Sequence, residues 1–148
     1  MTGAAIGRLV VESSDEAHNP LEVPFHGAAG VPNLYISPED IVDFAYVAEG
    51  FVAKRAVTIV NVGDEATSVD AANLVNPTTA EFAFSNPDDV PVNLNPGESV
   101  VLEITFENTG GDEGSEFANF ILNTSDDLIP EYPLDVVARR AERPTCEP

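Results

Sequence analysis

Basic residues are scarce in this sequence: six lysines and arginines stand against 26 acidic residues, and the formal net charge is −20. A surface of this charge repels the phosphates of nucleic acids and anionic membrane surfaces. The acidic residues are scattered as short pairs, which is typical of a solvated surface, as in salty surroundings, rather than of an acidic tail. The composition therefore argues against nucleic acid and anionic membranes as partners.

Cysteine is almost absent, since Cys146 is the single one, and no disulfide can form within the chain. We expect Cys146 to be an unpaired surface thiol, or to pair with a cysteine further along a longer protein. No run of 18 apolar residues occurs, and the first residues lack a basic region followed by an apolar core. A signal peptide or membrane anchor is therefore expected outside this chain.

Patterns that carry chemistry are missing as well. The two histidines, His18 and His26, have no cysteine or carboxylate at a zinc-ligand spacing, and both are expected at the surface. No serine lies in a G-x-S-x-G motif, and Gly110, Gly111 and Gly114 lack the lysine of a phosphate-binding loop. Calcium binding by an acidic loop stays open as an alternative, although no DxDxDG spacing supports it. We predict no catalytic, cofactor-binding or metal-binding residue, and hence no enzyme.

What is present is the profile of an all-β sandwich. A chain of 148 residues with 43% apolar content fits one ordinary domain with an appendage. Twelve prolines, ten glycines and the lack of a long apolar stripe at helical spacing argue against helices. The expected strands cover residues 8–12, 21–26, 33–37, 41–47, 55–61, 67–71, 81–84 and 99–106. Their expected core residues are Leu34, Ile36, Phe44, Val57, Ile59, Phe82, Phe84, Val100, Leu102, Ile104 and Phe106.

The connections are expected to be turns and loops. Residues 71–75 are expected to form a helical turn, and Gly63 to adopt a positive φ. Residues 86–99 carry dense turn chemistry, with Pro96 and Gly97 forming a type II turn. Residues 108–116 are expected to form a flexible loop.

A stretch near the start of the chain returns near its end without a gap. Residues 8–27, RLVVESSDEAHNPLEVPFHG, match residues 119–138, NFILNTSDDLIPEYPLDVVA, so that position 8 falls on position 119 at an offset of 111. We interpret the chain as one repeat module preceded by the end of another. The expected parts are a hairpin at 1–29 that resembles the end of a preceding repeat, a module at 30–140 and a linker or tail at 141–148, with 27–32 as the link after the hairpin.

Several short motifs follow one another in the module. They are VDFAYV at 42–47, NVG at 61–63, LNPGES at 94–99, LEITF at 102–106 and ILNTSDD at 121–127. This order resembles that of the ASH modules, named for abnormal spindle and hydin proteins, and of the bacterial choice-of-anchor D repeats. The resemblance covers about residues 31–140.

The resemblance implies an immunoglobulin-like antiparallel β-sandwich of seven to nine strands, with the N-terminal hairpin as an extra. Such a fold is related to the major sperm protein and PapD-like pilus-chaperone folds, and it supplies no catalytic residue. Two departures are visible: Ala45 stands where the family pattern has glycine, and the second hairpin ends in VVARR where Gly27 closes the first. Neither is expected to disturb the fold, and the second is consistent with the last module of an array.

The resemblance also sets the functional expectation. We expect a non-catalytic spacer, scaffold or assembly module of a secreted or surface-displayed bacterial protein with several repeats. The alternatives are an adhesin-type module whose loops bind glycan or calcium, and a cytoplasmic scaffold of the cilium or centrosome type. The acidity argues against an acidic microtubule surface as a partner. The expected partners are neighbouring modules or copies of the chain, contacted through strand edges and the N-terminal hairpin.

The N-terminal hairpin itself needs a partner, because a two-stranded hairpin alone in water is marginal. The apolar positions of its alternating face are Leu9, Val11, Leu21, Val23 and Phe25. We expect the hairpin to pack on the module or to add its strands to the sheet edge of a neighbouring chain.

Overall fold

The computed structural model consists of two compact units, Met1–Val31 and Pro32–Pro148. The residues that it describes are 3–11, 21–29 and 33–142. His18, Cys146 and most of the expected tail lie outside these ranges. Within them, no helix is long and apolar enough to cross a lipid bilayer.

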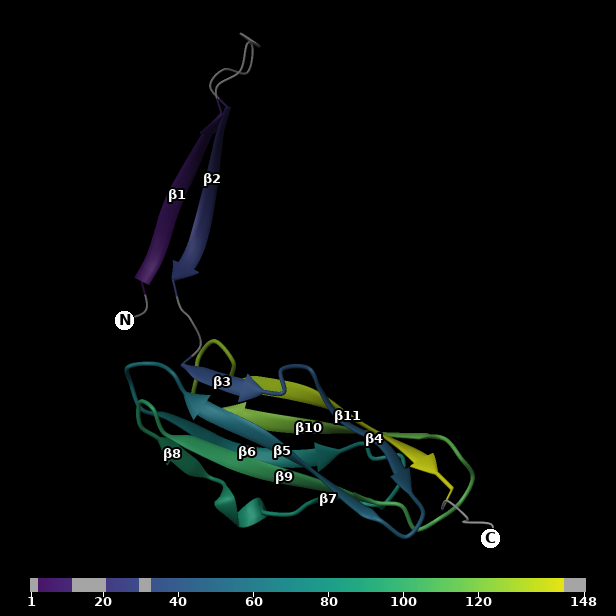
Figure 1. Ribbon diagram of the computed structural model, residues 1–148. Helices are drawn as coiled ribbons and strands as arrows, with labels where there is room; N and C mark the ends of the chain where they lie inside the picture. The colour runs from purple at the N-terminus through teal and green to yellow at the C-terminus, as the bar shows by residue number, and fades with distance from the viewer. Residues whose placement is uncertain (1–2, 12–20, 30–32, 143–148) are drawn as a thin grey trace. The chain divides into compact units, whose positions relative to one another are not determined.

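The first unit is an antiparallel hairpin of β1 (Gly3–Val11) and β2 (Leu21–Ala29), drawn in purple to blue in Figure 1. The hairpin confirms the strands predicted near residues 8 and 21. The strand β2 continues past its predicted end, however, because residues 27–29 pair with residues 3–5 of β1. Those small residues extend the ladder instead of forming a linker.

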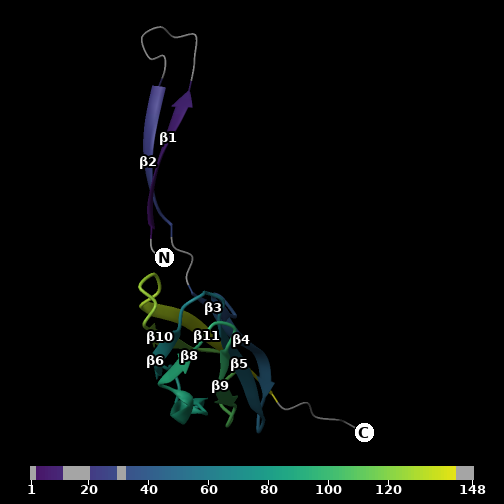
Figure 2. The same cartoon turned by 90° about the vertical axis from the view of Figure 1, so that its left-hand side faces the viewer.

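The second unit is a sandwich of two sheets, and its layers can be followed in Figures 1 and 2. The larger sheet has the order β4-β11-β10-β6-β8, and the smaller has the order β3-β5-β9-β7. The strands of the larger sheet are β4 (Ile41–Ala48), β6 (Thr67–Val75), β8 (Val92–Leu94), β10 (Ser115–Thr124) and β11 (Glu131–Ala141). Those of the smaller sheet are β3 (Leu34–Ser37), β5 (Val52–Asn61), β7 (Phe82–Phe84) and β9 (Ser99–Glu107). Over residues 33–142 these nine strands confirm the predicted sandwich.

The core forms by alternation along each strand. On β9, Leu102 and Ile104 are fully buried, whereas Val101 on the other face is about half exposed. Phe106 packs against Phe44 and Phe82, whose ring centroids lie 6.2 and 4.8 Å away from its own. The other predicted core residues are also buried or packed against this cluster. Burial of each large apolar side chain contributes about 1.5–3 kcal/mol to the free energy of folding, so the core between the two sheets supplies much of the driving force.

Two connections differ from the sequence-based expectation. Residues 71–75 are the second half of β6, not a helical turn, because they pair with residues 119–123 of β10. The ladder with a central strand outweighs the local preference of these residues. The three residues of β8, expected within a turn region, pair with the start of β6.

The glycines of the turns serve two purposes. Gly97 has a φ of +84°, as the predicted type II turn requires. The positive φ expected for Gly63 is wrong, and its glycine is needed for space instead: an added Cβ would lie 2.0 Å from Oδ1 of Asn33. A side chain at position 63 would therefore require Asn33 to move.

One strand pair departs from the antiparallel pattern, because β4 runs parallel to β11. Its register shifts so that Phe44 and Ala45 together lie opposite Ala138, which makes a β-bulge. Ala45 has a φ of 56°, a conformation that favours glycine. The bulge explains the glycine of the family pattern, and it forms here with alanine in that place.

The edge strands of the sandwich are short or, in β4, covered at two carbonyls. The edge strands β3, β7 and β8 have three or four residues each. The longer edge strand β4 is covered by Arg55 of β5, which donates hydrogen bonds to the main-chain carbonyls of Asp43 at 2.8 Å and Phe44 at 3.2 Å. Short, bulged and covered edges resist pairing with further strands.

Candidate functional site

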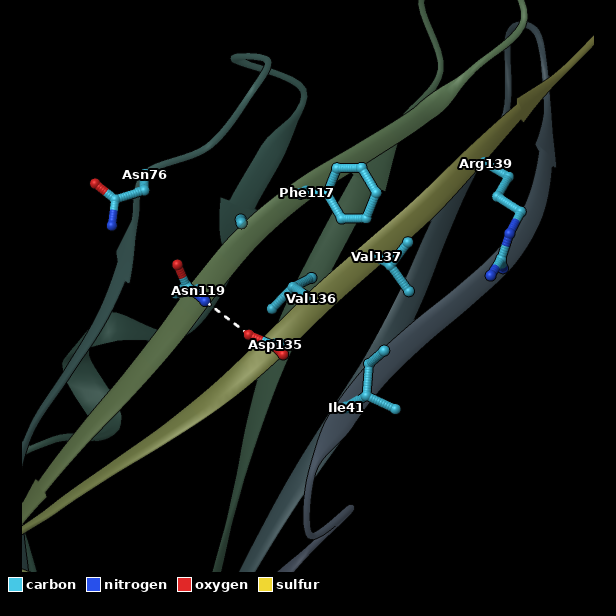
Figure 3. Close-up of a pocket in the computed structure, with 9 residues that line it drawn as sticks. Ile41, Asn76, Phe117, Asn119, Asp135, Val136, Val137 and Arg139 are labelled. Atoms are coloured by element: carbon cyan, nitrogen blue, oxygen red, sulfur yellow. Dashed lines mark hydrogen bonds between the residues drawn. The ribbon is translucent and has the colours of Figure 1, made fainter.

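The outer face of the larger sheet carries an open groove of about 340 Å³ (Figure 3). Its apolar centre is formed by Ile41 of β4, Phe117 of β10 and Val137 of β11. Ile41 and Phe117 are about half exposed, whereas Val137 is only 5% exposed although it pairs with Phe117 on the same face. Three neighbouring strands thus build an apolar strip on a surface where alternation favours polar residues.

Polar pairs flank this strip on both sides. The Nδ2 of Asn119 donates to Oδ1 of Asp135 at 2.9 Å, as the dashed line in Figure 3 shows. Beyond Val137, Arg139 forms an ion pair with Asp43 at 3.0 Å. Its guanidinium carbon lies 5.9 Å from the ring centroid of Tyr46, which is 74% exposed. The groove therefore has an apolar centre with a polar rim, the usual composition of a contact surface.

The charged and amide side chains beside the groove are paired with one another. The hydrogen bond from the main-chain N–H of Ala45, helped by Arg139 and opposed by burial, lowers the pKa of Asp43 below its usual value. The Asp43 carboxylate stays ionised and neutralises Arg139. Asp135 is held by the Asn119 amide, which is no nucleophile or base.

An ion cluster lies where the sandwich ends. Arg140 of β11 forms ion pairs with Glu81 at 2.7 Å and with Glu116 at 3.0 Å, and all three side chains are less than a fifth exposed. Burial raises the pKa of Glu81, but hydrogen bonds from Thr109 and the charge of Arg140 outweigh it, so the pKa is lowered overall. Arg140 also donates to the carbonyl of Gly110. The VVARR ending thus ties down the loop expected to be flexible.

Buried polar residues that the sequence does not reveal hold the connections. The carboxylate of Asp126 is only 4% exposed and accepts the main-chain N–H groups of Asn33 at 2.6 Å, Leu34 at 3.3 Å and Leu128 at 3.0 Å. These bonds tie the start of β3 to the turn between β10 and β11. Asp127, its neighbour in the SDD motif, is exposed. Two adjacent aspartates therefore have different roles, and one of them is structural.

The residues that carry the sequence hypotheses are placed as follows. His26 lies in β2 and pairs with Ile6, and Gly110 and Gly111 have positive φ values in the β9–β10 loop. In the described ranges, no three histidine, cysteine, aspartate or glutamate side chains gather as a metal site would require. None of these glycines lines the groove.

The two hairpins have the same register. Leu9 pairs with Val23, and the residues 111 positions later, Phe120 and Leu134, also pair. The same correspondence holds for each pair along residues 4–11 of β1. The backbone thus reproduces the offset found in the sequence.

These features first define a fold class, a two-sheet, PapD-like β-sandwich. A family model described as "Abnormal spindle-like microcephaly-assoc'd, ASPM-SPD-2-Hydin" (ASH) matches residues 32–127. The chain therefore belongs to the ASH family, which confirms the resemblance drawn from the sequence motifs. ASH domains are generally non-catalytic modules. Comparison with curated proteins gives no match.

Solved structures share the fold at low sequence identity. The ASH/PapD-like domain 7 of human CEP192 is 14% identical, over 76% of this chain and 88% of that one, with a TM-score of 0.55. A Porphyromonas gingivalis W83 protein of unknown function is 19% identical, over 94% and 66%, with a TM-score of 0.56. WR4, an MSP family member of C. elegans, is 9% identical, over 73% and 99%, with a TM-score of 0.46. At these identities the likeness concerns the fold alone.

Proposed function

We propose that this chain is a non-catalytic spacer and assembly module of a secreted or surface-displayed bacterial protein with several such modules. The observation that carries the proposal is the second hairpin with an identical register. Two copies of one closing element at a fixed offset are what consecutive modules of that period contain. In such an array the modules hold other parts of the protein apart and present contact surfaces.

The contact surface that the described sandwich offers is the groove rather than its edge strands. The groove offers half-exposed Ile41 and Phe117 with a polar rim. The edges offer little, because the longest of them, β4, is bulged and covered by Arg55. Strand addition at β4 would need Arg55 to release two main-chain carbonyls first.

The spacer role is tested with a chain in which residues 32–141 are followed directly by residues 31–148. This chain contains two complete modules at the natural offset. We expect small-angle scattering to show that the longest dimension grows by one module, and calorimetry to show both modules folded. A particle in which the two modules collapse side by side would contradict the spacer role.

The location is supported by the resemblance to choice-of-anchor D repeats, and the cytoplasmic scaffold is the rival. Protease treatment of intact source cells, followed by detection with an antibody against residues 33–142, separates the two. We expect the module to be cleaved or released without lysis. A module that is protected until the cells are broken would favour the cytoplasmic role.

A further inference from the structure

We infer that the hairpin β1–β2 is the closing hairpin of a second ASH-type sandwich, whose β4-type strand pairs parallel to β2 and whose β6-type strand pairs antiparallel to β1. This inference rests on the proposed array function and specifies how the module that contains the first hairpin is completed. The partner is an ASH-type sandwich that lacks its own last two strands.

The neighbours of β10 and β11 identify the missing strands. On one side β11 pairs parallel to β4, with Val136 opposite Val42. On the other side β10 pairs antiparallel to β6, with Phe120 opposite Leu74. In the described ranges, β1 and β2 form a sheet of only two strands. Because the registers agree, the outer edges of the first hairpin correspond to the edges that β4 and β6 occupy in the second.

The residues of the first hairpin resemble, position by position, the buried residues of the second. Leu9, Val11, Val23 and Phe25 occupy the register positions of Phe120, Leu122, Leu134 and Val136, which are at most 1% exposed. The small residues coincide too, since Gly7 and Gly27 stand at the positions of Ala118 and Ala138, which are at most 5% exposed. Both the large and the small core positions of the hairpin are thus repeated.

The hairpin needs two neighbouring strands, one parallel to β2 and one antiparallel to β1. A single sheet edge cannot provide both. A single exposed sheet edge can pair with only one strand of the hairpin. A closing hairpin of the β10–β11 type has a strand on each side: β6 pairs antiparallel to β10, and β4 pairs parallel to β11. An ASH-type sandwich without its last hairpin offers both strands at the right separation, and a single edge does not.

The test uses the full chain with residues 32–114 joined directly ahead of Ala4, so that Ala4 takes the place of Ser115. The first hairpin then follows strands of the β4 and β6 types at the natural offset. Amide hydrogen exchange is measured over residues 4–11 and 21–29 of the original chain. We expect these amides to exchange roughly 100-fold more slowly than in the 148-residue chain, because a local opening becomes opening of a folded module.

Matched variants give the control. Leu9→Asp, at the register position of the buried Phe120, is expected to abolish the added protection. Val10→Asp, one position along at a half-exposed residue, is expected to preserve it. Equal exchange in the fusion and the 148-residue chain would overturn the inference, whether the hairpin is unprotected in both or already covered in the shorter chain.

The chain with two complete modules separates this inference from the proposed function. If that chain folds as an extended pair while the first hairpin gains no protection in the fusion, the inference fails and the array function stands. If the complete pair collapses or does not fold, the array function fails instead.

Discussion

Asn61 and Asn108 make the same contacts at opposite ends of the sandwich. Each side-chain oxygen accepts the N–H of the glycine two residues later, at 3.0 Å. Each side-chain amide donates at 2.7 Å to a carbonyl of the opposite sheet, Leu94 for Asn61 and Val47 for Asn108. Because β5 and β9 are antiparallel neighbours, the two corners fasten the sheets at both ends.

The main-chain contacts of the two asparagines also match. The carbonyl of Asn61 accepts the N–H of Gly97 and that of Asn108 accepts the N–H of Gly50, both at 2.8 Å, and both glycines have a positive φ. We therefore expect similar costs for Asn61→Ala and Asn108→Ala. Each leaves buried main-chain groups unpaired, which destabilises the fold by about 3 kcal/mol. Denaturant unfolding measures both, with Asn119→Ala as the control at about 0.5 kcal/mol or less. Losses no larger than that of the control would contradict the role of the two corners.

Asp126 and Asp127 give a second test, because they differ in burial and not in chemistry. Asp126→Asn places an amide where the carboxylate accepts three main-chain N–H groups, and we expect a loss of about 2–3 kcal/mol. Asp127→Asn, at an exposed position, is expected to change stability by at most about 0.5 kcal/mol. Equal effects in urea unfolding would show that the buried carboxylate is dispensable.

Ala45→Gly is expected to stabilise the protein. The left-handed conformation costs an alanine about 1–2 kcal/mol, and the greater freedom of glycine in the unfolded chain offsets about 0.5–1 kcal/mol of that gain. The net result is a gain of about 0.5–1 kcal/mol, measured as a higher melting temperature. Ala83→Gly, within β7, serves as the control and is expected to destabilise. A lower melting temperature for Ala45→Gly would show that Ala45 is not strained.

Acid sensitivity is expected from Glu81. Its folded-state pKa lies below the ordinary value of 4.5, so the unfolded chain binds a proton more readily. The resulting stability is complete above the ordinary pKa and is lost as pH falls through the lowered one. We expect the melting temperature to drop below about pH 4.5, and less steeply in Glu81→Gln. The exposed Glu131→Gln is the control, and identical pH profiles for both variants would exclude Glu81 as the source.

The sequence predicts the core because the apolar residues alternate along each strand with the same two-residue period as burial. Val57 and Ile59 alternate with half-buried or exposed residues on β5, and both are fully buried. The repeat likewise predicts the hairpin, and its register follows from the offset. The parallel pairing of β4 with β11 is not predictable in this way, since it joins residues such as Val42 and Val136 that are distant in the chain.

The buried asparagines and the groove were not predicted, for different reasons. Asn61 precedes a recognisable turn, but Asn108 precedes a glycine-rich stretch that is typical of a loop. An N-x-G pattern repeated at the ends of β5 and β9 is the signal that could have found both. Ile41 and Phe117 form one groove only because β11 lies between their strands. Such proximity is a property of topology and not of spacing.

The covered β4 edge has a consequence for crowding. With Arg55 occupying two carbonyls of β4 and Ala45 bending it, sandwiches packed side by side lack a long straight ladder on which to template one another. In a protein made of many such units, the β4 edges of neighbouring sandwiches would therefore resist pairing into a fibril, even at high local concentration.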